Sequence, residues 1–315
     1  MPRLTFGVAL DFGSQLRPLS AQLERQTALL EAAEAAGFEI VAAGETTSPN
    51  SFHLPNALVV LTALAQCTRL RLCTGIALLP AWPVWRLALD TAELDQLSGG
   101  RLILGVGLGS RPIQTRAGWP AEAIGETVDE TLEALRALWS GADEYSGARV
   151  RVSGALPILP LQGGHVPIWV GGAIRRSAVR AARLGQGWYA GVNFRLSALP
   201  KQIATYSRAP GGAGGSVAVN RVTLVAERSG TVQERFEAHL AAGLAAYANP
   251  GESVEQVLDE VALVGTPQQV TAQLQRYVEA GVTHVFARLS LDGMPPEVAR
   301  ETIEAMGRDV IPRFG

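Results

Sequence analysis

Residues 69–111 read RLRLCTGIALLPAWPVWRLALDTAELDQLSGGRLILGVGLGSR, and this stretch decides the fold. Two apolar runs, at residues 70–79 and 102–106, flank a segment with helical spacing at residues 84–97. Apolar runs without alternation are typical of strands buried on both faces, as in a parallel sheet. Each run leads into small residues and glycine, which let a ligand approach the backbone closely. The stretch therefore predicts a strand, a helix and a second strand, with both strands ending at an edge that can receive a ligand.

The same alternation extends along the whole chain in both directions. Eight strands are predicted, at residues 4–10, 38–43, 70–79, 102–106, 168–170, 187–192, 217–226 and 282–289. Helices are predicted at residues 19–36, 55–67, 84–97, 121–139, 175–184, 196–207, 231–247, 254–261, 266–280 and 296–306. Residues 145–152 are expected to form a short hairpin inserted between the fourth and fifth strands.

Eight repeats without a long linker favour an α/β fold of the (βα)8 TIM-barrel class with insertions, built as one domain over residues 1–315. A doubly wound sheet is the alternative architecture. Active sites of such barrels lie at the carboxyl ends of the strands, so these ends hold the candidate residues.

Composition excludes several classes of protein. The net charge of −2 gives no broad attraction to nucleic acid or to an anionic membrane. No run of 18 apolar residues occurs, so no membrane span is expected, and the N-terminus is interpreted as a first strand. The two cysteines, Cys67 and Cys73, show no metal-ligand spacing and are expected to be buried free thiols, which suits the cytoplasm.

The segment after the second strand, GETTSPNSFH at residues 44–53, carries a carboxylate and an imidazole. Glu45 and His53 are the candidate catalytic residues because either group can transfer a proton. After the third strand, small residues followed by bulky ones predict a flat apolar wall. Trp82 either covers a substrate pocket there or packs against a helix.

The fourth strand ends in GVGLGSR at residues 105–111, which lacks the spacing of a dinucleotide-binding fingerprint. Arg111 is a candidate cation for an acidic substrate or a phosphate. The fifth strand ends in GGAIRRS at residues 171–177 and leads directly into a helix. Free N–H groups at a helix start bind anions, so this turn is a candidate phosphate site, with Gly171, Arg176 and Ser177 among its contacts. Trp188 supplies aromatic bulk beside it. No metal site is predicted.

Several segments, taken together and in order, resemble the bacterial-luciferase-like monooxygenases. They are EAAGFE (34–39), residues 68–80, LDQLSGGRLILGVGLG (94–109), PIWVGG (167–172), LGQGW (184–188), GTPQQV (265–270) and AGV (280–282). The resemblance implies a barrel that binds FMN or the deazaflavin F420, with phosphate contacts at Gly172, Ala173 and Arg176. It places the cofactor ring against Thr74, Gly75, Ile76, Gly107 and Gly109, and a cis peptide at Gly75-Ile76. It also implies a homodimer and, for FMN, a separate flavin reductase.

Two departures from the luciferases bear on the activity. Their glutamate–histidine pair after strand 2 corresponds to Glu45-Thr46, and their phosphate-binding arginine after strand 4 corresponds to Leu108. The resemblance therefore implies a non-luminescent flavin- or F420-dependent oxidoreductase or monooxygenase acting on a small organic substrate. A non-catalytic flavin-binding barrel and a barrel lyase or isomerase acting on a sugar phosphate are the alternatives.

Overall fold

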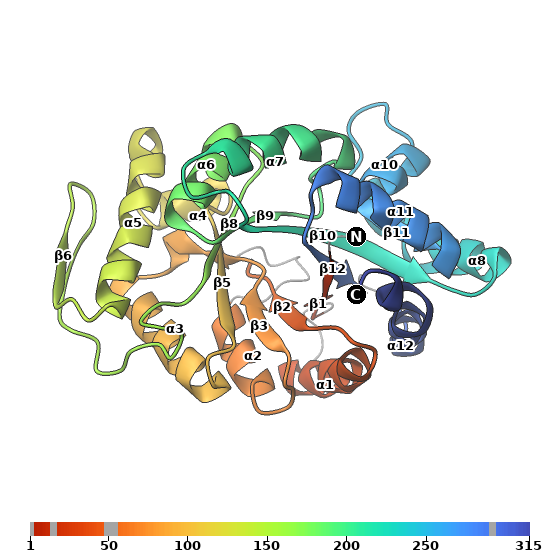
Figure 1. Cartoon of the computed structure of the whole chain (residues 1–315), viewed down its shortest axis with the longest axis horizontal. Helices are drawn as coiled ribbons and strands as arrows, with labels where there is room; N and C mark the ends of the chain where they lie inside the picture. Colours follow the sequence, from red (N-terminus) through yellow and green to blue (C-terminus); the bar gives the residue numbers. More distant parts are fainter. Residues whose placement is uncertain (1–2, 13–17, 47–55, 290–293) are drawn as a thin grey trace.

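The computed structural model describes residues 3–12, 18–46, 56–289 and 294–315. Its centre is a closed barrel of eight parallel strands, in the order β1, β2, β3, β5, β8, β9, β10 and β12. Helices surround the strands, and the β6–β7 hairpin lies at the left of the view (Figure 1). The predicted (βα)8 barrel with insertions is confirmed. Among the described residues, no helix combines the length and the apolar character needed to cross a bilayer.

The strands are β1 (Thr5–Leu10), β2 (Ile40–Ala43), β3 (Arg71–Thr74), β4 (Ala77–Leu78), β5 (Leu102–Gly107), β6 (Glu144–Ser146), β7 (Arg151–Ser153), β8 (Ile168–Gly171), β9 (Gly187–Ala190), β10 (Ser216–Val225), β11 (Ala262–Gly265) and β12 (His284–Arg288). The α-helices are α1 (Leu19–Ala35), α2 (Ala57–Leu64), α3 (Val84–Ser98), α4 (Arg111–Arg116), α5 (Ile124–Trp139), α6 (Arg175–Leu184), α7 (Leu199–Arg208), α8 (Ser229–His239), α9 (Ala241–Ala245), α10 (Val254–Val261), α11 (Pro267–Ala280) and α12 (Pro296–Ala305). Short 3₁₀ turns lie at Leu79–Ala81, Ala121–Ala123, Leu196–Ala198 and Ile311–Arg313, and a π-helical turn lies at Met306–Val310.

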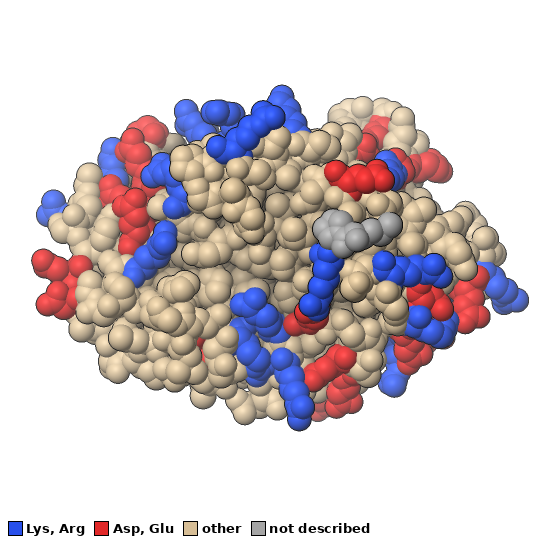
Figure 2. Space-filling view, in the orientation of Figure 1, with Lys and Arg blue, Asp and Glu red and all other residues tan. Residues whose placement is uncertain are grey.

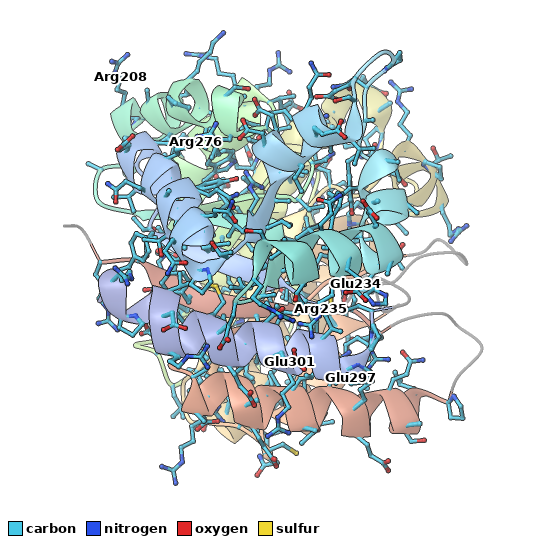
Figure 3. All side chains as sticks on the ribbon, turned by 90° about the vertical axis from the view of Figure 1, so that its right-hand side faces the viewer. Arg208, Glu234, Arg235, Arg276, Glu297 and Glu301 are labelled. Carbon is cyan, nitrogen blue, oxygen red and sulfur yellow. The ribbon has the colours of Figure 1, made fainter. Side chains whose placement is uncertain are left out.

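The structure contains α4, a helix that the sequence did not predict, and three further regions differ from the prediction. The strand predicted at residues 70–79 is broken into β3 and β4 by a bulge. β10 is long enough to pair with β9 and β12 inside the barrel and with the additional strand β11 beyond it. The helix predicted at residues 231–247 is divided into α8 and α9. Side chains on α8 face α12, where Arg235 bonds Glu301 (Figure 3).

The inside of the barrel is a separate apolar cluster to which every barrel strand contributes. Its members alternate along the strands with residues that face the helices, as the two-residue period of a strand requires. They are Ala9, Ile40, Ala42, Cys73, Ile103, Trp169, Tyr189, Ala218 and Phe286. The larger cluster lies between the strands and the helices and includes Trp188.

Part of the LDQLSGGRL segment has a structural role at the amino-terminal end of the barrel. The Arg101 guanidinium donates to the carbonyl oxygens of Ala65, Thr68, Leu70 and Ser98 at 2.5–2.8 Å. These bonds tie the end of α2 to the starts of β3 and β5 and satisfy carbonyl groups left free where a helix ends. The two cysteines differ from the expectation in one respect, since Cys73 is buried but Cys67 is exposed.

His284 lies at the start of β12 and contacts the Trp169 ring edge-on at 4.8 Å. Burial and the positive charge of Arg71 lower the pKa of His284 to about 4. Between pH 6.5 and 4 the unfolded chain binds a proton here that the folded protein does not bind. The unfolding free energy therefore decreases as the pH falls through this window.

We expect urea unfolding at pH 4 and pH 7 to show a pH-dependent loss of stability of at most about 3 kcal/mol from this histidine. His284→Phe should remove that part of the loss, and replacement of the exposed His165 by Ala should retain it. An equal pH dependence in wild type and His284→Phe would contradict the assignment.

Candidate functional site

The carboxyl end of the barrel has a glycine-lined half and a polar half. Following the alternation of the inner cluster, the next inward positions on β3, β5 and β8 are Gly75, Gly105 with Gly107, and Gly171. The next inward positions on β1, β10 and β12 are instead Asp11, Asn220 and Arg288. One half of the barrel mouth thus has glycine at its inward positions, and the other half has side chains that form hydrogen bonds.

The bulge after β3 forms the floor of the glycine-lined half. The Gly75-Ile76 peptide is cis, as the family resemblance implied. The Gly75 N–H donates to the Ala43 carbonyl at 2.7 Å, and the Ile76 carbonyl accepts from the Glu45 N–H at 3.1 Å. A Cβ on Gly107 would lie 2.0 Å from Ile76 Cδ1, so glycine at this position makes room for the Ile76 side chain. Ile76 remains partly exposed at the mouth.

Glu45 holds the bulge to its surroundings. Its carboxylate accepts from the N–H of Leu78 at 2.8 Å, from the Trp82 indole N–H at 3.0 Å and from the N–H of Ala57 at 3.1 Å. Burial raises the pKa of Glu45, and the three donors oppose that shift. The side chain is 7% exposed. This arrangement joins the end of β2 to β4, to the start of α2 and to Trp82.

The turn between β8 and α6 has the features of an anion-binding site. Gly172 adopts φ 141°, and a Cβ there would lie 2.7 Å from the Ser177 side chain. The turn from Gly172 to Arg176 is exposed, and α6 begins at Arg175, so the N–H groups of Arg175 and Arg176 have no acceptor within the helix. The Ser177 hydroxyl donates to the Ile174 carbonyl at 2.6 Å, which fixes the helix start.

Two residues of the LGQGW segment hold the two ends of β8. The Trp188 indole N–H donates to the Gly172 carbonyl at 2.9 Å. The Gln186 side chain accepts from the Ile168 N–H at 2.8 Å, at the other end of β8. Trp188 was predicted to contact the substrate, but it has no exposed surface. Its described role is to hold the Gly172 carbonyl of the turn.

The polar half of the mouth was not predicted from the sequence. Arg288 forms two hydrogen bonds with Asp11, at 2.5 and 2.8 Å, and donates to the Tyr247 hydroxyl at 3.1 Å. Burial acts to lower the pKa of Arg288, but the charge and hydrogen bonds of Asp11 raise the pKa overall, which keeps this buried arginine charged. Beside this pair, the Asn220 amide donates to the Tyr189 hydroxyl at 3.3 Å. The two-residue period of a strand could have predicted these polar residues, because each lies two positions after an inward-facing residue: Ala9, Ala218 or Phe286.

The remaining predicted residues divide by exposure. Thr74 has no exposed surface and donates to the Gly105 carbonyl at 2.7 Å, so the structure places it behind the site. Gly109 is exposed, but a Cβ there would lie 2.6 Å from Ile113. Arg111 is exposed at the start of α4, and Trp82 is partly exposed. His53 lies outside the described residues.

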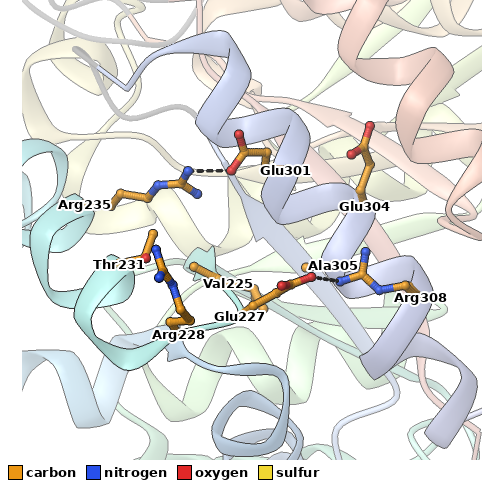
Figure 4. A pocket seen from close by; sticks show the side chains of 10 residues that line it. Val225, Glu227, Arg228, Thr231, Arg235, Glu301, Glu304, Ala305 and Arg308 are labelled. Atoms are coloured by element: carbon orange, nitrogen blue, oxygen red, sulfur yellow. Dashed lines mark hydrogen bonds and ion pairs between the residues drawn. The ribbon is translucent and has the colours of Figure 1, made fainter.

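Two hollows are lined by residues outside the inner faces of the barrel strands. A cavity of about 340 Å³ lies between α8 and α12. Four of its charged lining residues form ion pairs with one another, Arg235 with Glu301 at 2.5 Å and Arg308 with Glu227 at 2.9 Å (Figure 4). A groove of about 700 Å³ is lined by Trp82 and Trp119 and therefore borders the Glu45 network. Among the described residues, no group of three or more His, Cys, Asp or Glu side chains could hold a metal ion.

The charge around the turn after β8 suits a phosphate group. α6 and α7 contain no acidic residue, and basic side chains gather over them at the upper edge of Figure 2. The basic residues of these helices are Arg175, Arg176, Arg180, Arg183, Lys201 and Arg208. Two of them, Arg180 and Arg183, face Asp129. Arg176 stands at the turn itself, where a guanidinium can bind phosphate together with the helix N–H groups.

We expect Glu45→Ala to lower the unfolding free energy by about 2–4 kcal/mol, because the Leu78, Ala57 and Trp82 donors then lose their acceptor in a buried position. The matched control is Glu39→Ala, at the other end of β2, where Glu39 pairs with the exposed Arg3. That control should cost less than about 1 kcal/mol. Equal losses in the two variants, measured by urea unfolding, would contradict the anchoring role of Glu45.

Comparison with known proteins agrees with this geometry. Residues 4–284 match the family described as luciferase-like monooxygenase. The oxygenase component of a flavin-dependent trigonelline monooxygenase from Acinetobacter baylyi is 30% identical over 148 residues, which is 45% of this chain and 41% of that protein. The chain therefore matches less than half the length of that relative.

Two solved structures share the fold over nearly the whole chain. The monooxygenase RslO1 from Streptomyces bottropensis has a TM-score of 0.87 at 24% identity, with 99% of this chain and 100% of that one covered. A coenzyme F420-dependent tetrahydromethanopterin reductase from Methanopyrus kandleri has a TM-score of 0.77 at 18% identity, with the same coverage. Since the family match spans most of the barrel, this chain belongs to the luciferase-like monooxygenase family.

Proposed function

We propose that this protein is a non-luminescent oxidoreductase that uses FMN or F420 to act on a small organic substrate. One observation carries the proposal: the bulge at Gly75-Ile76 and the exposed anion turn at Gly172–Arg176 both lie at the carboxyl end of the barrel. A cofactor with a flat ring and a phosphate tail matches these two features together. A ligand with a phosphate but no ring would leave the bulge without a role.

The residues of this chain would bind and orient the cofactor. The first N–H groups of α6 and the Arg176 guanidinium would hold the phosphate. Ile76 would support one face of the ring, and Glu45 would act as a positioning residue because it fixes the bulge. The ring supplies the redox chemistry when it is bound, and the protein contributes orientation and the exclusion of water.

Both cofactors suit the described residues, because each has a flat ring and a phosphate. The similarity to an oxygenase component supports FMN that is reduced by a separate flavin reductase. The shared fold with an F420-dependent reductase supports direct hydride exchange with F420. The absence of histidine after Glu45, where Thr46 stands, supports a reaction without light emission.

We further propose that the protein works as a homodimer in the cytoplasm. Val59 on α2 and Leu97 on α3 are 60% and 56% exposed, and these two helices pack side by side. Exposed apolar residues on adjacent helices favour a covered face. Both cysteines are free, which suits a reducing compartment.

A non-catalytic flavin carrier remains the second candidate, and Thr46 in place of the luciferase histidine is the observation that favours it. The two functions separate in a turnover assay with a panel of small organic substrates. The enzyme should oxidise at least one substrate with FMNH2 and oxygen or with F420, or reduce at least one with reduced F420. Bound cofactor without turnover across the panel would favour the carrier.

We expect FMN or F420 to bind with micromolar or better affinity, measured by fluorescence titration. Arg176→Glu should weaken that binding by roughly 10- to 100-fold, because a charge-assisted hydrogen bond is lost and a like charge replaces it. Arg208→Glu is the matched control, since it makes the same change at an exposed arginine at the end of the neighbouring helix α7. Unchanged affinity in Arg176→Glu would contradict the phosphate placement, and binding of neither cofactor to wild type would overturn the proposed function.

A further inference from the structure

Asn220 is a buried amide whose hydrogen bonds the protein only partly satisfies. The residue is 6% exposed and faces the lumen of the barrel from β10. Its Nδ2 donates to the Tyr189 hydroxyl at 3.3 Å, but its Oδ1 is buried and has no partner among the described residues. Buried amide oxygens almost always accept a hydrogen bond, so the unused acceptor indicates a missing partner.

The position of Asn220 brings it close to the bulge. Tyr189 reaches across the lumen, and a Cβ on Gly75 would lie 3.0 Å from its hydroxyl oxygen. β10 and β3 stand opposite one another in the ring of strands. The Asn220 amide therefore lies one hydrogen bond away from the hydroxyl that borders the bulge, on the far side of the mouth.

The neighbouring Arg288 already has protein partners. Its Nε and Nη2 donate to Asp11, and its Nη1 donates to the Tyr247 hydroxyl. Asn220 differs from this pair because one end of its amide is held by Tyr189, while the other end is buried without a partner among the described residues. Turning the amide by 180° would exchange the two ends and leave a donor open in place of an acceptor. The unpartnered end is therefore an acceptor in one orientation and a donor in the other. A partner that offers both a donor and an acceptor can bond it in either case.

An imide edge is such a partner, since it places an N–H between two carbonyl groups. The rings of FMN and F420 share this edge. Resting on the proposed function, we propose that Asn220, oriented by Tyr189, is the residue that binds the imide edge of the cofactor ring. The cofactor would then be fixed at three places: its phosphate at the turn after β8, and its ring at Ile76 and at the Asn220 amide.

The test compares the normal cofactor with its analogue methylated at the imide nitrogen. FMN, F420 and the two N3-methylated analogues are titrated against wild type, Asn220→Ala and Asn220→Leu, with fluorescence quenching as the measurement. Wild type should bind the methylated form of its cofactor about tenfold more weakly than the normal form, the difference expected for one hydrogen bond. Both Asn220 variants should bind the two forms equally, and should bind the normal cofactor about tenfold more weakly than wild type.

Asn220→Leu keeps the size of the side chain among the apolar neighbours Ala218 and Phe286, so it guards against loss of the fold in Asn220→Ala. Gln66→Ala removes an exposed amide at the end of α2 and should bind as wild type does. Discrimination against the methylated cofactor that is equal in wild type and Asn220→Leu would overturn this inference while leaving the proposed function intact. Failure of wild type to bind either normal cofactor would overturn both.

Discussion

The site depends on two glycines of β5, Gly105 and Gly107, because the neighbouring residues Thr74 and Ile76 leave no room for a side chain at either position. A Cβ on Gly105 would lie 2.0 Å from the Thr74 carbonyl oxygen, and a Cβ on Gly107 would lie 2.0 Å from Ile76 Cδ1. These two glycines let the chain leave β3, form the bulge and return as β4 beside the same strand. The bulge then supplies the Ile76 carbonyl and the Leu78 N–H that Glu45 bonds. A larger residue on β5 would therefore disturb the mouth without touching a ligand.

Several segments that carry the family resemblance stabilise loops rather than contact the mouth. Arg101 binds carbonyl groups at the amino-terminal end of the barrel, and Gln186 fixes the start of β8. Trp188 holds the carbonyl of Gly172 from the helix side of the strand. Such residues keep the strand ends in place, so a motif shared by enzymes with different substrates can reflect a common scaffold.

The sequence predicted the barrel and the turn after β8 because their signals are local. Apolar runs predict the strands, and glycines follow several of the strand ends. An exposed helix start follows Gly172. The roles of Thr74 and Trp188 depend on which side of a strand faces the lumen, and a short apolar run does not reveal that. Asp11 and Arg288 are 277 positions apart, so their pairing follows from barrel closure and not from any spacing in the chain.

Barrel closure also has a consequence for synthesis of the chain. Residues Thr5–Ala9 of β1 pair with His284–Arg288 of β12. The first strand therefore cannot complete its pairing until nearly the whole chain has been synthesised. At about 5–20 residues per second, this interval is roughly 15–55 s. During that time the backbone N–H and C=O groups of β1 that pair with β12 lack their partners, and other chains can pair with them. Chaperone contact in the cell is therefore most valuable to this protein before its final strand emerges.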